Sequence, residues 1–398
     1  MALASTSFMT AVEIIGTTDH AKVDMSDVLS AIWQSSTGVG GHIKIKGKAT
    51  NIEHKWSEDA LNAVYVTAKM PGSTTLSVTS PAASSNVARI LRTGAILYPE
   101  TGDMRVRITT TPVTGSNVVT MYGSTAFTAV AASTKFFVTA MPKSDLDAGS
   151  EDISKARTVR KNFSQVFERG VRIEESRKHV DVYAVSDELQ HQIKLRTMEA
   201  KREMEMAVLH GYARVSASNT YAASSELRTM AGAIQLIRDT NLDSTNEDSN
   251  VVNASSAALS ENLINSLAFK IWDKGGLDEE SDCAIFVGAY QQRVISRMER
   301  DIRRVEQGEK KLGYYKNVFL TELGPELPIV LVRWLQKDKM LIIDRNRWFL
   351  TPLGTDTWHL EKLAKTGRNE HWQLSGQYTM TMRNACEAHG LIHTLATS

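Results

Sequence analysis

The longest regular pattern of apolar and polar positions lies near the middle of the chain, over residues 185–210. Apolar residues recur there at intervals of three, four or seven and form one helical stripe: Leu189, Ile193, Ala200, Met204 and Ala207. Ser186 is the expected N-cap and Gly211 the expected end. About 26 residues at roughly 1.5 Å each give a rod of about 40 Å. A rod with so narrow a stripe must lie across a flat surface, with strands on one side and a neighbouring chain on the other.

Helical and strand-like patterns alternate after this rod. Residues 260–276 predict an amphipathic helix that Ser260 caps and that Gly275 and Gly276 end. The apolar run CAIFVG, residues 283–288, predicts a buried strand, and a helical pattern starts again at residue 289. The runs PIVLVRWL, KMLIIDR and RWFLTPLG predict further strands. This alternation indicates an α+β or α/β unit.

The patterns before the rod are mainly those of strands. Residues 42–56 alternate like a strand with one wet face, with Ile43 and Ile45 on the other face, and the following SEDALNAV predicts a short turn of helix. Residues 64–141 are rich in Thr, Ser, Val and Gly, and short alternating runs between turn signals predict a small all-β insertion shaped as a sandwich or barrel. Residues 158–180 predict a long strand or a strand pair.

Composition and charge narrow the functional classes. The chain has 398 residues and a formal net charge of +1, so tight wrapping of nucleic acid is not expected. Its two cysteines exclude a disulfide framework and fit a reducing compartment, with both thiols packed as small hydrophobes. The first 41 residues are polar and carry one short amphipathic stretch that contains Ile32 and Trp33. They predict an arm that needs a partner surface, and they lack the pattern of a signal peptide. No apolar run approaches the roughly 20 residues of a membrane span.

Candidate chemistry is sparse. The chain has no phosphate-binding, dinucleotide-binding, zinc-protease or serine-hydrolase motif. His389 and His393 have the spacing of half a metal site on a helix, but a structural pair is the stronger interpretation. The acidic residues 145–152 lack the ligand ladder of a calcium loop and are interpreted as a linker. A basic face at residues 297–304 carries mixed signs, which favours a solvated helix over a DNA contact. The tryptophans of the C-terminal third, at 334, 348, 358 and 372, are interpreted as core and interface anchors rather than a platform for bases.

Several segments, taken in order, resemble one family. They are NIEHKWSEDAL (residues 51–61), TVRKNFSQVFERGVRI (158–173), EMEMAVLHG (203–211), WDKGG (272–276) and LAKTGRNEHWQLSGQYTMTMRNACEAHGLI (363–392). The chain resembles the major capsid proteins of tailed phages (Caudoviricetes) with the Hong Kong 97-like fold, in the family typified by long-headed podophages. The segments cover most of the chain after residue 150 and only short parts before it. Some relatives crosslink a lysine to an asparagine, and no motif assigns that pair here.

The resemblance implies an α+β capsid fold made of an arm, an extended loop, a spine helix and an apical unit. Residues 1–41 would form the N-terminal arm, and residues 42–63 with 142–183 the extended loop and peripheral strands. Residues 64–141 would form the insertion, and 184–212 the spine helix. Residues 213–375 would form the apical domain, and 376–398 a closing strand.

A self-assembling, non-enzymatic shell subunit of the virion is therefore the leading hypothesis, made in the host cytoplasm, with no cofactor and no membrane contact. Its expected partners are copies of itself in hexamers and pentamers, together with separate scaffolding, portal and decoration or cement proteins, and weak contact with packaged DNA. The alternatives are a tail or decoration protein that binds a host or carbohydrate through the β-rich insertion, and an enzyme. The residues expected at subunit interfaces are Ile32, Trp33, Arg169, Arg172, Glu199, Arg202 and Glu203.

Overall fold

A computed structural model describes most of the chain. The residues described are 38–59, 61–71, 74–122, 129–142, 153–179, 187–213, 227–239, 242, 250–278, 280–298, 318–365 and 367–397. Backbone contacts divide the chain into two compact units. Ser57–Val159 is one unit, and the segments before and after it together make the other.

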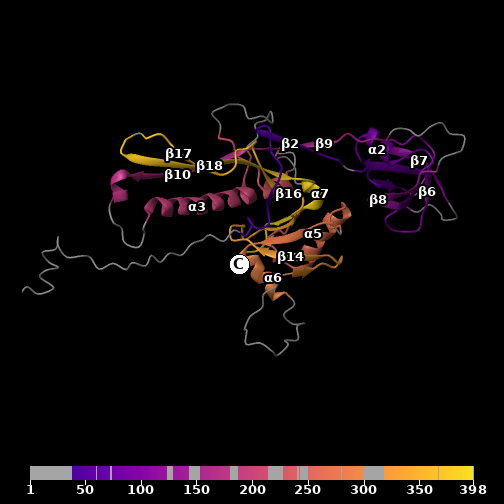
Figure 1. Cartoon of the computed structure of the whole chain (residues 1–398). Coiled ribbons are helices and arrows are strands. Elements are labelled where there is room, and N and C mark those ends of the chain that lie inside the picture. Colours follow the sequence, from indigo (N-terminus) through magenta and orange to yellow (C-terminus); the bar gives the residue numbers. More distant parts are fainter. Residues whose placement is uncertain are drawn as a thin grey trace, which may run out of the picture. The chain divides into compact units, whose positions relative to one another are not determined.

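The larger unit contains a five-stranded sheet that supports the long helix. Its order is β1 (Lys44–Ile45), β16 (Trp348–Pro352), β18 (Asn369–Met382) and β10 (Gln165–Glu174), with β17 (His359–Lys362) also paired to β18. All ten residues of β10 pair antiparallel with β18, from Gln165 opposite Tyr378 to Glu174 opposite Asn369. The long helix α3 (Glu188–His210) runs beside these two strands (Figure 1). The flat surface expected under the rod is therefore the β10–β18 pair.

The same unit contains a six-stranded mixed sheet. Its order is β11 (Val251–Asn253), β19 (Gly390–His393), β15 (Met340–Asp344), β12 (Cys283–Val287), β14 (Glu326–Leu331) and β13 (Val318–Leu320). The strand predicted from CAIFVG is confirmed as β12, and all five of its residues are buried. A strand can be buried throughout only if both faces of its sheet are covered.

Different helices cover the two faces of this sheet. Ile285 of β12 packs in a core with α5 (Glu261–Asp273) and α6 (Ala289–Arg297). Its neighbour Phe286 packs in a second core with the end of α3 and with α4 (Ala233–Arg238). That second core also holds side chains of β10, β16 and β18, so it joins the two sheets. The cap predicted for α5 is confirmed, because the Ser260 hydroxyl accepts a hydrogen bond from the Leu263 N–H at 3.3 Å.

The smaller unit is a closed barrel with its own core. Its strands are β3 (Tyr65–Met70), β4 (Thr75–Ser80), β7 (Gly115–Met121), β6 (Val106–Ile108), β5 (Ile96–Pro99) and β8 (Val130–Ala140), in that order around the barrel. The insertion was expected to contain strands alone, but it also contains helix α2 (Ser84–Ile90). Val87 and Ile90 of α2 are buried in the barrel core, and this tertiary packing stabilises a helix only seven residues long.

A two-stranded sheet lies at the boundary between the units. It pairs β2 (Glu53–Glu58) with β9 (Thr158–Phe163), which leads through Ser164 into β10. The strand pair predicted over residues 158–180 is thus β9 and β10, followed by the 3-10 helix η1 (Glu175–His179). The helical turn expected in SEDALNAV is wrong, because Ser57 and Glu58 extend β2 in its pairing with β9.

Two further local predictions needed correction. Lys44 and Ile45 form a strand of two exposed residues at the edge of the sheet, so Ile45 does not face a core. The long helix begins at Glu188, because the Asp187 side chain accepts the Gln190 N–H at 3.1 Å and acts as the N-cap. Ser186, the cap expected from the sequence, lies outside the described residues.

The helix ends at Gly211 as predicted, although not through a left-handed residue, since φ of Gly211 is −52°. A Cβ atom there would lie 2.5 Å from the Met230 carbonyl oxygen, so close backbone packing requires the glycine. Gly232 packs against Gly211, and its N–H donates a hydrogen bond to the Gly211 carbonyl at 2.7 Å. The end of α3 is therefore locked to the segment that leads into α4.

Candidate assembly surfaces

The spine helix α3 is covered unevenly along its length. All four of its buried residues lie in the C-terminal half: Ala200, Glu205, Val208 and Leu209. From Glu188 to Glu199 every residue is half-buried or exposed, including Leu189 and Ile193 of the predicted stripe. The stripe is thus a core element only after residue 199, and its earlier part lies at a surface.

Arg169 and Glu203, both expected at an interface between subunits, lie together within one subunit. The guanidinium of Arg169 on β10 lies 2.6 Å from the carboxylate of Glu203 on α3. The two side chains are 40% and 36% exposed, so solvent screens the pair and its contribution is small. The contact joins α3 to β10 within one subunit. Strand alternation directs Arg172 to the opposite face of β10, where it is exposed.

Glu199 and Arg202 also have partners inside the subunit. Glu199 accepts two hydrogen bonds from Arg196, one turn earlier, at 2.5 and 2.7 Å. The Arg202 guanidinium lies 5.9 Å from the Trp334 ring centroid, within the range of a cation–π contact. Arg172 thus differs from the other described candidates, since it makes no hydrogen bond, ion pair or ring contact with the described part of the chain. Ile32 and Trp33 lie outside the described residues.

A groove lies between the first turns of α3 and the end of β10. Its volume is about 430 Å³, and Arg172, Arg177, Glu188, Gln192 and Arg196 are among its lining residues. Three of its lining side chains are cationic and two are carboxylates, namely Glu174 and Glu188, and Glu188 accepts from Gln192 at 2.8 Å. This basic groove, with its excess of one cation, lies beside the uncovered half of the spine helix.

The last residues of the predicted arm anchor the chain to α3. The Val39 N–H donates to the buried Glu205 carboxylate at 2.6 Å, and Val39 itself is buried. A Cβ atom on Gly38 would lie 2.6 Å from the Leu331 carbonyl oxygen, so the close approach of the two backbones requires the glycine. Burial raises the pKa of Glu205, although the hydrogen bond from Val39 acts in the opposite direction. The sequence signal for this anchor is a single glutamate within the apolar end of the helix, and sequence reasoning missed it.

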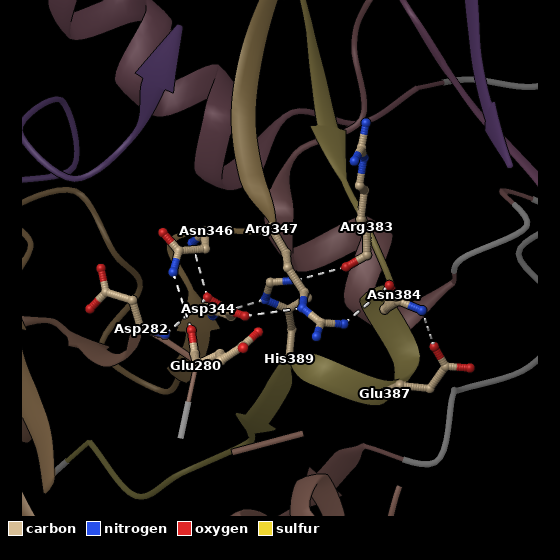
Figure 2. A network of polar contacts seen from close by, with 9 residues as sticks. All are labelled: Glu280, Asp282, Asp344, Asn346, Arg347, Arg383, Asn384, Glu387 and His389. Carbon is tan, nitrogen blue, oxygen red and sulfur yellow. Dashed lines mark hydrogen bonds and ion pairs between the residues drawn. The ribbon is translucent and has the colours of Figure 1, made fainter. Parts of the chain in front are cut away.

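A polar network holds the two sheets of this unit together (Figure 2). His389 is fully buried between the β15–β16 turn and the β18–α7 connection, where α7 is Ala385–Ala388. Its Nδ1 accepts the Asp344 N–H at 3.1 Å, so its Nε2 carries the proton and donates to the Arg383 carbonyl at 3.2 Å. Burial lowers the pKa of His389 to about 3. The ring is therefore a neutral connector at physiological pH.

Charged groups complete the same network. One Asp344 oxygen accepts the Asn346 N–H at 2.9 Å, and the other lies 3.2 Å from Arg347 Nε. Arg347 also donates to the Asn384 side chain at 3.2 Å, and Asn384 donates to Glu387 at 2.7 Å. Two of the chain connections between the sheets, from β15 to β16 and from β18 to β19, pass through these contacts, which gives the joint a defined geometry.

The described residues contain neither a candidate metal site nor a membrane-spanning helix. No group of three or more His, Cys, Asp or Glu side chains among them could hold a metal ion. His389 ends α7 and His393 lies on β19, so the two do not share a helix face. Burial raises the pKa of the Cys283 thiol to about 12, which fits a packing role. Within the described part of the chain, no helix is long and apolar enough to cross a membrane.

Comparison with known proteins agrees with this architecture. The capsid of cyanophage A-1(L) is similar, with a TM-score of 0.55 and 9% identity over 96% of this chain and 98% of that chain. The capsid of the native GTA particle is similar too, with a TM-score of 0.54 and 9% identity over 98% of this chain and 100% of the other. The predicted Hong Kong 97-like capsid fold is thereby confirmed.

Sequence comparison identifies the family. No curated protein matches the chain. The model of the SU10 major capsid protein family, however, matches residues 6–396. Because this match covers almost the whole sequence, the chain belongs to the SU10 major capsid protein family and is a structural capsid protein rather than an enzyme.

Proposed function

We propose that copies of this capsid protein assemble through hexamers and pentamers into the closed head shell of a tailed phage, which encloses double-stranded DNA. Family membership and fold support this function. The observation that carries the assembly step is the N-terminal half of α3, where no residue from Glu188 to Glu199 is buried. A helix stabilised mainly by packing of its apolar face needs a further surface against this half.

The parts of the subunit have separate roles in this proposal. The five-stranded sheet and α3 form the shell wall, and the six-stranded sheet with α5 and α6 forms the apical domain around the capsomer axes. The strands β16 and β17 would belong to the wall, because they pair with β18 in the five-stranded sheet. The barrel unit is carried on the extended loop. The segment before Gly38, with Ile32 and Trp33, is the arm that crosses to a neighbour.

The basic groove and Arg172 are the proposed contact of the wall with a neighbouring subunit. Arg169, Glu199, Arg202 and Glu203 support this surface from within, because their contacts lie inside one subunit. The exposed guanidinium of Arg172 is available to a carboxylate of another copy. Such contacts are weak singly and strong in a closed shell, because each subunit engages several neighbours at once.

Other partners follow from the same function. A net charge of +1 allows packaged DNA to contact the inner wall without being held tightly. Scaffolding, portal and decoration proteins are proposed as separate chains, and assembly is proposed to take place in the host cytoplasm.

Negative-stain electron microscopy with light scattering of the purified protein tests the proposal. Closed shells, rings of five or six, or sheets are expected, either alone or with co-expressed neighbouring phage genes. In Arg172→Glu we expect fewer particles, while Lys69→Glu, an equal charge reversal on an exposed barrel position, should assemble like the wild type. A wild-type protein that stays small under all these conditions would contradict the proposed function.

A further inference from the structure

The six-stranded sheet carries an exposed aromatic surface on α5. Phe269 and Trp272 are 53% and 51% exposed, although Ile264, Leu267 and Ile271 of the same helix are buried. Their ring centroids lie 6.1 Å apart, so the two rings form one tilted pair. Exposed aromatic pairs of this kind are typical anchors of protein interfaces, because they bury a large area with little loss of side-chain entropy.

The same sheet carries an exposed aliphatic surface on its edge strand β13. Val318 and Leu320 are 46% and 64% exposed, whereas Phe319 between them is buried in the core that includes α5. Since side chains alternate along a strand, Val318 and Leu320 face away from α5. The aromatic and aliphatic surfaces therefore lie on opposite sides of one sheet.

The charges around the two surfaces are complementary. Glu322 and Glu326 are exposed beside the aliphatic surface, and Glu326 is the register partner of Leu320. On α5, Lys270 and Lys274 lie next to the aromatic pair and donate to backbone carbonyls, at 3.4 and 2.9 Å. One acid, Asp273, is also present on that turn. The anionic side chains beside the aliphatic surface thus complement the mainly cationic side chains beside the aromatic surface.

We propose that the aromatic surface of one subunit packs on the aliphatic surface of the next subunit around a capsomer axis. This inference rests on the proposed function and names the surfaces that build the ring. A closed ring needs a head-to-tail contact between two different surfaces, whereas a two-fold dimer needs one self-complementary surface. Two unlike surfaces on opposite sides of the same sheet meet the first requirement.

A disulfide test measures whether the surfaces meet. We would place Trp272→Cys and Leu320→Cys together in a Cys386→Ser background, since Cys283 is buried and Cys386 is half-buried. Mild oxidation of assembled particles should give a ladder of linked subunits on a non-reducing gel. Each single cysteine variant should give no ladder. Assembled particles without linked subunits in the double variant would overturn the inference.

Loss of assembly provides the second test. Trp272→Ser and Leu320→Ser should each raise the protein concentration needed for assembly about tenfold, while the unassembled subunits keep the wild-type melting temperature, because both sites are exposed. The matched control is Leu360→Ser on β17, an exposed leucine outside the six-stranded sheet. Assembly of the first two variants at the wild-type concentration would overturn the inference and leave the proposed function intact. Failure of the wild type to assemble would instead contradict the proposed function.

Discussion

The two halves of α3 have similar helical patterns and different surroundings. From Met204 onward the helix packs into the core that joins the two sheets, and Gly211 at its end is hydrogen-bonded to Gly232. From Glu188 to Glu199 it lies on β10 with no residue buried. One continuous helix thus contributes to the stability of the subunit at one end and, in the proposed function, presents a surface for assembly at the other. Sequence periodicity alone does not separate these roles, since Leu189 and Met204 occupy the same stripe.

The largest expected effect compares one leucine from each half. Leu209 is fully buried, and Leu209→Ala should lower the free energy of unfolding by about 2–5 kcal/mol, because it leaves a cavity in the shared core. Leu195 is half-buried, and Leu195→Ala should cost less than about 1 kcal/mol. Urea unfolding of the unassembled subunit measures both values. Equal losses would show that the two halves contribute alike to the fold.

The next effect concerns the lock at the end of α3. A Cβ atom on Gly232 would lie 2.5 Å from the Gly211 nitrogen and 2.8 Å from the Leu209 carbonyl carbon, and backbone atoms cannot move aside easily. Gly232→Ala should therefore cost about 1–3 kcal/mol, as other overpacked sites do. Gly41→Ala is the control, because nothing lies within 4 Å of its added Cβ. Thermal unfolding of both variants compares them, and a Gly232→Ala protein as stable as the control would refute the lock.

Elements with strong local signals were predictable from the sequence. The cap of α5 needs only Ser260 and the backbone three residues later, and β12 needs only an unbroken apolar run. The observed start of α3 differs from the predicted one because two adjacent residues, Ser186 and Asp187, are both good caps. The helix α2 was missed because seven residues carry little periodicity, and its stability comes from the barrel core.

The candidate surfaces were less predictable, since they depend on which distant segments meet. Arg169 and Glu203 are 34 positions apart, and only the packing of α3 on β10 makes them partners within one subunit. The anchor at Glu205 depends on Val39, which lies 166 positions away. A charged residue in sequence shows the capacity for an ion pair, while the fold decides whether its partner lies in the same chain.

A smaller effect concerns Glu205, the one buried carboxylate in the packed half of α3. Burial raises its pKa, so the folded state binds this proton more tightly than the unfolded state does. Its contribution to stability is therefore largest at acidic pH and is lost as pH rises from the ordinary glutamate value through the raised one. Glu205→Gln keeps an acceptor for the Val39 N–H and removes the buried charge. At pH 7 we expect a gain on the order of 1 kcal/mol.

Unfolding curves of the wild type and Glu205→Gln across pH 4–8 check this expectation, because the difference between the two proteins removes the effect of other titrating groups such as His389. The difference should grow in favour of the variant as pH rises and then level off. A difference that stays constant with pH would show that Glu205 does not titrate differently in the folded and unfolded states.

The smallest expected effect is that of the ion pair between β10 and α3. Arg169 on β10 and Glu203 on α3 are both partly exposed, so a double-mutant cycle with Arg169→Ala and Glu203→Ala should give a coupling free energy below about 1 kcal/mol. Arg172→Ala, on the other face of β10, should show no coupling with Glu203→Ala.

The same three variants can be assayed for assembly. The assembly defect of Arg172→Ala should then exceed that of Arg169→Ala, since we propose that Arg172 contacts a neighbouring subunit, whereas Arg169 pairs with Glu203 inside its own subunit. Equal assembly defects would place both arginines in one interface and would contradict the separation of roles along α3.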